Sequence, residues 1–405
     1  MARVWILLLS LSIVGLMKQL VLVEADLPAI YIFGDSTVDV GTNPHLSESL
    51  AQANMPFNGI DYPFSNATGR FSNGYNTADL IVRLLDKTHS RSPPPFLSLL
   101  ESMTYFKRDL TRGANFASGG SGILDSTGNA TYRKVVPLGE QIQQFSTVRP
   151  NITIILGPDK ADKLISNSLY LISVGGNDFF DYQRYNSTTM LPETFMTILL
   201  NAYATHLEDL YTLGARKFAI IGVPPIGCCP AERVVNLKLN GSDGCFEQMN
   251  DLARSFYNAT ETLLNSFTSQ FQGVKYSLGN AFDLTMTIIN NPLVFGRRTG
   301  YPIPGPEKAL RQYHPPTKDC RQQDSNLSQM SIKDVKTACC GNGTLNGEGK
   351  CTPLANLCPN REEYLFWDFV HPTQAVSWLA ALTLYGGAQQ FVTPMNFSQL
   401  APIDI

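Results

Sequence analysis

The sequence lacks an excess of charge of either sign. Its 405 residues contain 31 Lys and Arg against 34 Asp and Glu, for a net charge of −3 at pH 7. This balance provides neither the basic surface that attracts nucleic acid nor an acidic tail. Internal repeats and long low-complexity tracts are also missing. With 43% hydrophobic residues the chain can bury a substantial core, and its length suits two or three ordinary domains or one large α/β domain.

Long apolar runs are missing after the amino terminus. The first 25 residues combine a positive MAR, the apolar stretch VWILLLSLSIVGLM and a small-residue VEA before Asp26. This pattern predicts a secretory signal peptide with cleavage after Ala25. A membrane anchor is the alternative, but Lys18 interrupts the apolar run short of the ~20 residues needed to span a bilayer. We therefore expect a secreted, extracellular protein with no transmembrane anchor in the mature chain.

Cysteine is missing from the first half of the chain. In an oxidising compartment the eight cysteines would form disulfides, and their pairing stays open because eight cysteines allow about 105 connectivities. A zinc site is the alternative, but the vicinal pairs lack the spacing of zinc ligands and no histidine follows at finger distance. The cysteines are Cys228, Cys229, Cys245, Cys320, Cys339, Cys340, Cys351 and Cys358.

Nine Asn-x-Ser/Thr sequons also agree with a secretory route, where such asparagines accept glycans. The candidate glycosylation sites are Asn66, Asn129, Asn151, Asn186, Asn240, Asn258, Asn326, Asn342 and Asn396.

The apolar pattern alternates between strand-like runs and helical periodicity. This alternation predicts βαβ units and a mainly parallel sheet covered by helices on both faces. Ligands of such sheets bind outside the carboxyl ends of the strands. The strand-like runs cover 29–33, 169–174, 218–222 and 274–278, and the helical patterns cover 77–86, 202–213, 246–271 and 373–385.

Two of the strand-like runs end in glycine followed by small polar residues. GDS follows the first run and contains Ser36, and GGND follows the second and contains Asn177. Taken alone, GDS is better explained as a turn, because Gly, Asp and Ser favour bends. Ser36 becomes a nucleophile only if a base accepts its proton and a third group orients that base.

His371 is the histidine with the most suitable neighbours for such a base. In FWDFVHPT, Asp368 stands three residues before it, so one turn can bring the carboxylate to Nδ1 and leave Nε2 free for a hydroxyl. An acidic cap before the helix over 373–385 is the alternative interpretation.

Acyl transfer also needs hydrogen-bond donors where the oxyanion develops. GGNDF offers the amide of Asn177, and ANFASGGSGI over 114–123 offers backbone N–H groups. GGND also resembles a tight turn or a partial calcium loop, but neither stretch has the acidic spacing of a complete calcium loop. We therefore predict no metal site.

Four segments together resemble a known family. GDSTVDVGTN, GANFASGGSGI, ISVGGNDF and YLFWDFVHPT occur in the order and form of the four blocks of the GDSL esterase/lipase family, within the SGNH hydrolase superfamily. TGRFSNG, VPPIGCCP and TACCGNGTLNG are similar to its plant-type secreted branch, and the likeness runs from about residue 29 to 386. It implies a three-layer α/β/α sandwich of flavodoxin-like kind, in one hydrolase domain over 26–405.

The resemblance also implies a role for each matching residue. Ser36 matches the nucleophile, His371 the base and Asp368 the acid that orients it. The oxyanion hole would combine the N–H of Ser36, the Asn177 amide and a glycine N–H from the second block. That glycine falls on Gly119 or Gly120, of which we prefer Gly120.

The implied activity is hydrolysis of a small-molecule or polymeric ester through an acyl-enzyme, with no metal and no organic cofactor. An acyltransferase that uses the same acyl-enzyme, or a catalytically silent secreted binding glycoprotein, is the alternative. Neither the ester substrate nor the oligomeric state can be read from the sequence.

The chain departs from the family pattern at two places. Thr42 replaces the first of two paired asparagines in the first block, and we expect this to affect loop structure only. NPLVFG is separated from the TACCG motif by the polar, Pro-rich stretch 297–331, which is either a loop insertion or an artefact of gene modelling. Cys320 lies inside this stretch and Cys229 is additional to the usual set, so no disulfide pairing is copied from the family.

Overall fold

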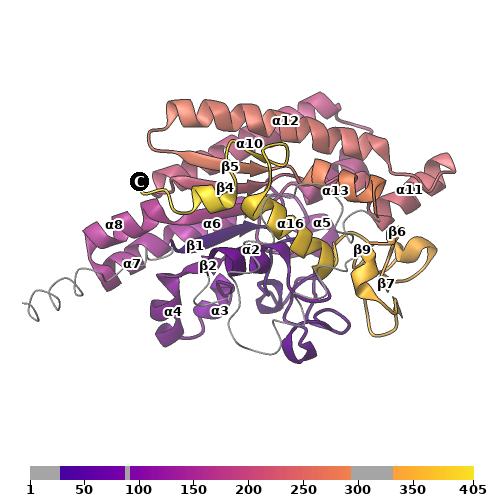
Figure 1. Cartoon of the computed structure of the whole chain (residues 1–405), viewed down its shortest axis with the longest axis horizontal. Coiled ribbons are helices and arrows are strands. Elements are labelled where there is room, and N and C mark those ends of the chain that lie inside the picture. The colour runs from indigo at the N-terminus through magenta and orange to yellow at the C-terminus, as the bar shows by residue number, and fades with distance from the viewer. Residues whose placement is uncertain (1–27, 87–91, 293–331) are drawn as a thin grey trace, which may run out of the picture.

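A six-stranded sheet runs through the centre of the computed structural model, which describes residues 28–86, 92–292 and 332–405 (Figure 1). The predicted signal peptide and the 297–331 stretch therefore lie outside the described residues. The strand order is β10-β5-β4-β3-β1-β2, and β10 is antiparallel to β5 while the other neighbours are parallel. The strands are β1 Ile30–Gly34, β2 Gly113–Asn115, β3 Leu169–Ser173, β4 Lys217–Ile221, β5 Lys275–Gly279 and β10 Val392–Thr393.

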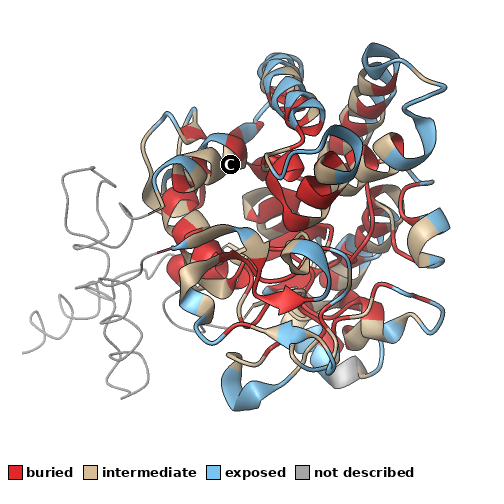
Figure 2. Ribbon diagram, turned by 90° about the vertical axis from the view of Figure 1, so that its right-hand side faces the viewer, coloured by how far each residue is buried: buried red, intermediate tan, exposed pale blue. Residues whose placement is uncertain are grey.

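Each face of the sheet carries its own hydrophobic core, because successive strand residues point to opposite faces. In β1, Tyr31 and Phe33 pack into one core, whereas Ile30 and Ile32 pack into the other. Buried residues accordingly gather along the sheet and the inner sides of the helices (Figure 2). This arrangement confirms the expected three-layer sandwich with a mainly parallel central sheet.

Helices of very different length cover the two faces. The second core is covered by α2 Thr77–Leu85, α16 Gln374–Gly386 and α17 Phe397–Leu400. The first is covered by α3 Phe96–Leu99, α4 Met103–Leu110, α6 Leu138–Ser146, α7 Val148–Leu156, α8 Pro158–Asn167, α10 Pro192–Thr212, α12 Glu247–Gln270 and α13 Ala281–Asn290. Other helices lie in the connections, namely η1 Asn43–His45, η2 Pro63–Ser65, α5 Asn129–Tyr132, α9 Gly176–Asp181, η3 Tyr182–Asn186, η4 Ile226–Cys228, α11 Pro230–Asn240, η6 Thr344–Asn346 and η7 Arg361–Glu363.

The predicted elements agree with the structure at most places. The strand-like runs correspond to β1, β3, β4 and β5, and the helical patterns correspond to α2, α10, α12 and α16. The helix expected over 202–213 is longer, since α10 begins at Pro192 and buries Phe195 and Leu199 before the predicted start. Proline is favourable at the first position of a helix because its missing N–H would have no partner there.

Strand order places a switch point between β1 and β3. Because β1 lies between β2 and β3, the connections leaving β1 and β3 diverge on opposite sides of the sheet. Loops that diverge in this way open a crevice at the carboxyl ends of the two strands. The GDS and GGND segments both begin at that crevice.

The carboxyl-terminal part of the chain adds a small disulfide-bonded region (Figure 1). In it β6 Asp334–Ala338 pairs with β9 Tyr364–Phe366, and β7 Cys340–Gly341 pairs with β8 Asn356–Leu357. The disulfides Cys339–Cys358 and Cys340–Cys351 surround the fully buried Trp367, whose Nε1 donates to Asn58 Oδ1 at 2.9 Å. This region therefore supports the segment that continues into Asp368.

Three disulfides occur among the described residues, as the cysteine content predicted. The third joins Cys228 to Cys245, while Cys229 is buried and has no disulfide partner among the described residues. Cys320 lies outside the described residues. No helix in the described ranges has both the length and the apolarity that crossing a membrane requires.

Candidate active site

Ser36 lies on a tight turn at the carboxyl end of β1. Gly34 has φ +147°, and a Cβ at this position would lie 2.0 Å from the carbonyl oxygen of Ser173 in β3, so only glycine fits between the strands. The carboxylate of Asp35 then accepts hydrogen bonds from the N–H and the hydroxyl of Thr37, at 2.9 and 2.7 Å. These bonds close the turn and leave Ser36 at its tip, facing the crevice.

His371 and Asp368 form the local turn that their spacing predicted. The Asp368 Oδ1 accepts the N–H groups of Val370 and His371, at 3.0 and 2.8 Å. The Nδ1 atom of His371 lies 2.9 and 2.8 Å from the two carboxylate oxygens. Since a carboxylate only accepts, Nδ1 carries a proton, and in a neutral imidazole Nε2 then presents its lone pair.

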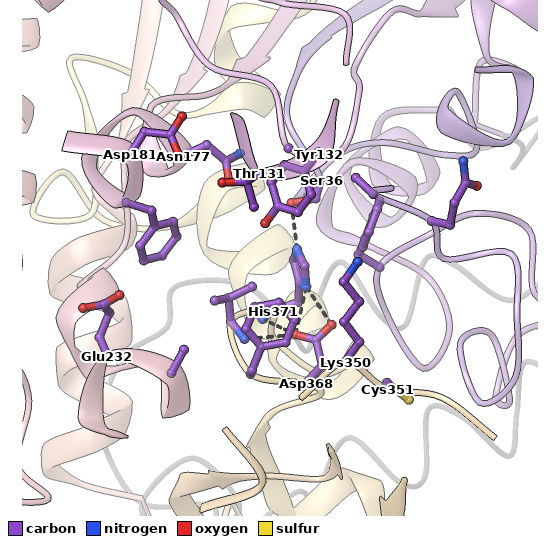
Figure 3. A pocket seen from close by; sticks show the side chains of 18 of the residues that line it. Ser36, Thr131, Tyr132, Asn177, Asp181, Glu232, Lys350, Cys351, Asp368 and His371 are labelled. Carbon is purple, nitrogen blue, oxygen red and sulfur yellow. Dashed lines mark hydrogen bonds and ion pairs between the residues drawn. The ribbon is translucent and has the colours of Figure 1, made fainter. Parts of the chain in front are cut away.

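Folding brings this pair to Ser36 across a separation of 335 residues. The Nε2 atom of His371 lies 2.7 Å from Ser36 Oγ (Figure 3). Asp368 and His371 are only 4% and 6% exposed, and the Phe71 ring lies 5.1 Å from the imidazole. The arrangement places a buried imidazole, oriented by a carboxylate, within hydrogen-bond distance of the Ser36 hydroxyl.

Asn177 and Gly120 line the same hollow as Ser36. Asn177 lies in the first turn of α9, and its Nδ2 donates one hydrogen to Ser121 O at 2.8 Å, which leaves the second hydrogen available. The N–H of Gly119 donates to Asp39 Oδ2, whereas among the described residues the N–H groups of Gly120 and Ser36 donate to no protein group. This difference favours Gly120 over Gly119 as a donor to a ligand.

Two buried carboxylates that sequence reasoning did not single out connect the loops of the site. Asp39 accepts N–H groups from Gly41, Thr42 and Gly119, which joins the loop after β1 to the loop after β2. Thr42 thus belongs to the loop framework, as expected, and its own hydroxyl is buried without a partner among the described residues. Burial raises the pKa of Asp39 to about 6.

Asp178 makes the corresponding connection from the loop after β3. It accepts the N–H groups of Ile123 and Leu124, at 2.9 and 3.0 Å, and the Thr127 hydroxyl at 2.7 Å. Burial raises its pKa to about 6. The GGND segment is therefore neither a simple turn nor a calcium loop, because its aspartate binds protein N–H groups.

Gln141 is a further positioning residue that the sequence did not reveal. From α6, its Oε1 accepts the N–H of Gly34 and its Nε2 donates to the Gly34 and Val136 carbonyls, each at 2.8 Å. A glutamine within an amphipathic helix carries no signal of this role, because its partners belong to distant segments.

One hollow beside Ser36, which we call the charged hollow, has an empty volume of about 820 Å³. Its walls include Glu232, Arg184, Lys350 and Gln52, together with several aromatic side chains. Figure 3 shows Glu232 and Lys350 on opposite sides of the Ser36–His371 pair.

A second hollow, which we call the apolar hollow, also reaches Ser36 and His371. It has an empty volume of about 640 Å³ and lies at the ends of β3 and β4, where Val223, Pro224 and Ile226 form part of its wall. Neither hollow was foreseen from the sequence. In the parts of the chain that the structure describes, no cluster of His, Cys, Asp and Glu is arranged to hold a metal ion.

The sequons that fall within the described residues all lie at least partly at the surface. Asn151 and Asn396 are partly exposed, and Asn326 lies outside the described residues. The remaining six are exposed, namely Asn66, Asn129, Asn186, Asn240, Asn258 and Asn342. Glycan occupancy at these positions stays a prediction.

Comparison with known proteins identifies relatives along nearly the whole chain. The family model described as GDSL-like Lipase/Acylhydrolase matches residues 30–382. A GDSL esterase/lipase of Arabidopsis thaliana is 33% identical over 380 residues, covering 93% of this chain and 91% of that protein. The GDSL esterase/lipase LTL1 of the same plant is 32% identical, covering 93% and 91%.

Proposed function

Because the chain belongs to the GDSL-like lipase/acylhydrolase family, we propose that it is a secreted serine esterase that hydrolyses carboxylic esters through Ser36, His371 and Asp368. The observation that carries the proposal is the continuous chain of hydrogen bonds from Asp368 through His371 to Ser36 Oγ. The names of the relatives support an esterase or lipase activity without identifying a substrate.

In the first half of the reaction, Ser36 Oγ attacks the ester carbonyl carbon and its proton passes to His371 Nε2. Asp368 holds Nδ1–H and stabilises the imidazolium that forms. The carbonyl oxygen becomes an oxyanion, which the N–H groups of Ser36 and Gly120 and the Asn177 amide stabilise. Losing one such donor typically costs about 3 kcal/mol of transition-state stabilisation.

Collapse of the tetrahedral intermediate breaks the bond to the alcohol oxygen, and His371 Nε2 returns its proton to that oxygen. The free alcohol leaves, and Ser36 carries the acyl group. A water molecule then gives a proton to His371 and attacks the acyl carbon. The carboxylic acid is released and Ser36 regains its proton, so the cycle needs no metal or organic cofactor.

Export of the protein is supported by two independent features. The amino-terminal sequence has the pattern of a signal peptide. The three disulfides are bonds that persist in oxidising compartments and are rare in the cytosol.

A fluorophosphonate probe tests the proposal directly, because it reacts with an activated serine whatever the ester substrate is. We expect one label per parent molecule, located on Ser36 by mass spectrometry, and none on Ser36→Ala. Ser187→Ala, which removes an exposed hydroxyl away from the site, should label like the parent. A folded parent that takes no label, or a Ser36→Ala variant that labels normally, would contradict the proposal.

A further inference from the structure

One donor of the proposed oxyanion hole is the backbone N–H of Gly120, and a backbone group has no rotamer that could aim it. This N–H belongs to the same peptide group as the Gly119 carbonyl. The cis peptide bonds of the described residues lie elsewhere, so this peptide is trans. In a planar trans peptide the C=O and N–H bonds point in opposite directions. The partner of the Gly119 oxygen therefore determines where the Gly120 N–H points.

That partner is the side chain of Asn43, the first residue of η1. Its Nδ2 donates to the carbonyl oxygens of Gly119 and Ala51, each at 2.8 Å. Its Oδ1 accepts the Ser118 hydroxyl at 2.6 Å. Since only an NH₂ group can satisfy two carbonyls, these contacts fix the orientation of the amide. One amide hydrogen of Asn43 thus holds the peptide group that carries the Gly120 N–H.

Burial makes the Gly119 carbonyl depend on this contact. Asn43 is 0% exposed, and Gly119 is buried as well. A Cβ at Gly119 would lie 2.4 Å from the ring of Phe71, so this ring packs directly against the Gly119 backbone. The same ring lies 5.1 Å from the His371 imidazole. A buried carbonyl needs a hydrogen-bond donor, and among the described residues Asn43 supplies it.

The other polar group of Gly119 is held from the same loop. Its N–H donates to Asp39 Oδ2 at 2.9 Å. Asp39 and Asn43 both follow β1 in the segment that carries Ser36, so one segment binds both polar groups of Gly119. The next N–H along the chain, that of Gly120, is the one left to bind a ligand. The nucleophile and this donor are thereby placed relative to each other.

Resting on the proposed esterase function, we propose that Asn43 is a positioning residue of the oxyanion hole. By binding the Gly119 carbonyl it directs the Gly120 N–H toward the point where the substrate oxygen becomes negatively charged. Asn43 itself does not touch the substrate. Its effect should appear in the transition state, because donors aimed at the developing charge stabilise that state most.

A pair of substrates that differ in one atom tests this role. p-Nitrophenyl butanoate develops its negative charge on oxygen, whereas O-(p-nitrophenyl) thionobutanoate develops it on sulfur, which accepts hydrogen bonds more weakly. The measured quantity is the ratio of kcat/KM for the ester to that for the thionoester. A variant that weakens an oxyanion donor lowers this ratio. A variant that only loses folded protein lowers both rates equally and leaves the ratio unchanged.

Asn43→Leu removes the amide hydrogens while keeping a side chain of similar size. We expect kcat for the ester to fall by about 100-fold, as for the loss of one oxyanion donor, with little change in KM. The ester-to-thionoester ratio should fall by about tenfold or more. Asn177→Ala, which removes a proposed donor directly, is the positive control and should also lower the ratio.

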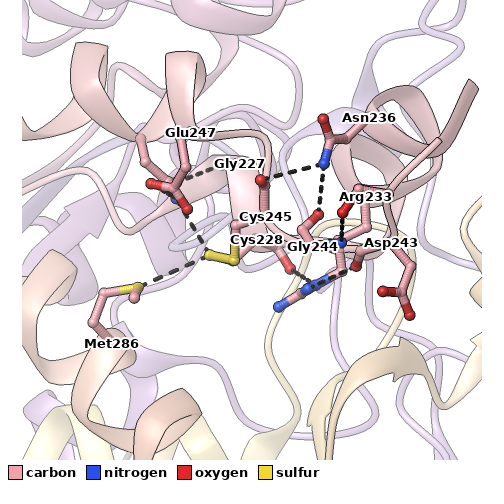
Figure 4. Close-up of a disulfide and its surroundings, with 11 residues drawn as sticks. Gly227, Cys228, Arg233, Asn236, Asp243, Gly244, Cys245, Glu247 and Met286 are labelled. Carbon is pink, nitrogen blue, oxygen red and sulfur yellow. Dashed lines mark hydrogen bonds between the residues drawn. A yellow bond between two sulfur atoms is a disulfide. The ribbon is translucent and has the colours of Figure 1, made fainter. Parts of the chain in front are cut away.

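Asn236→Leu is the matched negative control. Asn236 is 7% exposed and its Nδ2 also donates to two backbone carbonyls, those of Gly244 and Cys245, at 3.2 and 3.4 Å. Figure 4 shows this asparagine beside the Cys228–Cys245 disulfide, and it lines neither hollow. The same substitution there should leave the ester-to-thionoester ratio as in the parent.

Ser118→Ala gives a milder perturbation for the case that Asn43→Leu does not fold. It removes the hydroxyl that binds Asn43 Oδ1 and keeps both Nδ2 donors. The ester-to-thionoester ratio should fall by about threefold, which corresponds to the net contribution of one hydrogen bond.

The outcomes separate this inference from the proposed function. A folded Asn43→Leu variant with a ratio within twofold of the parent overturns the positioning role. If that variant does not fold, a Ser118→Ala ratio equal to that of the parent overturns it. The esterase proposal survives either result if fluorophosphonate still labels Ser36. A folded parent with neither labelling nor hydrolysis overturns both.

Discussion

Replacing Asp368 with asparagine should abolish most activity by changing which nitrogen of His371 carries the proton. The Oδ1 atom of Asp368 accepts two backbone N–H groups. An asparagine must keep an oxygen at that position, so its NH₂ group replaces Oδ2, which lies 2.8 Å from His371 Nδ1. Nδ1 also lies 2.9 Å from Oδ1, but we expect the NH₂ group at the shorter contact to donate to Nδ1, so that the imidazole proton resides on Nε2, facing Ser36 Oγ.

An imidazole in that tautomer has no lone pair for the serine proton. In a Ser-His-Asp protease the same substitution keeps the geometry but lowers kcat by roughly 10⁴-fold. We expect a loss on the order of 10³- to 10⁴-fold here, because the two backbone N–H donors at Oδ1 enforce the orientation of the asparagine. Substrate binding should change little, so the loss should appear in kcat rather than in KM.

The assay combines initial rates on a p-nitrophenyl ester with the rate of fluorophosphonate labelling of Ser36, which reports serine activation without a natural substrate. Asp181→Asn is the matched control, since Asp181 also lines the charged hollow but accepts the Gly128 N–H and does not contact His371. A folded Asp368→Asn variant that keeps kcat and labelling within tenfold of the parent would refute the tautomer argument.

Three further predictions follow from burial, covalent cross-linking and hollow shape. Because burial raises the pKa of Asp178 from 3.8 to about 6, its contribution to stability is present below pH 3.8 and lost as the pH rises through 6. Asp178→Asn should therefore reduce the change in the free energy of unfolding between pH 4 and pH 6 by about 3 kcal/mol. Denaturant titrations that give the variant the same pH dependence of the free energy of unfolding as the parent would refute this. Replacing both Cys340 and Cys351 with serine removes a cross-link spanning 11 residues. The free energy of unfolding, measured by the same titrations, should fall by about 3 kcal/mol. An unchanged free energy of unfolding would contradict this prediction. Thr285→Phe should narrow the apolar hollow and lower the ratio of kcat/KM for an octanoate ester to that for an acetate ester by about tenfold or more. Thr287→Phe lies on the same helix but outside that hollow, and should leave this ratio unchanged. An unchanged octanoate-to-acetate ratio in Thr285→Phe would place the acyl group elsewhere.

Local features of the fold and site could be predicted because their partners lie nearby in the sequence. Apolar runs ending in glycine predicted β1 and β3, and the strand–helix alternation predicted the layered sheet. The Asp368–His371 contact was foreseeable because three residues form one turn. Resemblance of the motif blocks supplied the remaining candidates, Ser36, Asn177 and Gly120.

Contacts between distant segments were decided only by the tertiary structure. The disulfide pairing could not be predicted, because the fold decides which cysteines lie close together. In the structure Cys228 pairs with Cys245. The anchoring roles of Gln141 and Asp178 depend on N–H groups from other loops, which no pattern in the sequence identifies.

The sequence by itself determined the layered architecture and the family, and it supplied the candidate site residues, because short motifs and the periodicity of buried side chains are local features of the chain. The tertiary structure alone placed His371 beside Ser36, 335 residues away, and opened two hollows of different polarity around them. It also left the Oε2 atom of Glu232 without a hydrogen-bond partner among the described residues. Whether a buried polar atom is satisfied depends on every neighbour that folding brings to it, and only the folded chain defines that set.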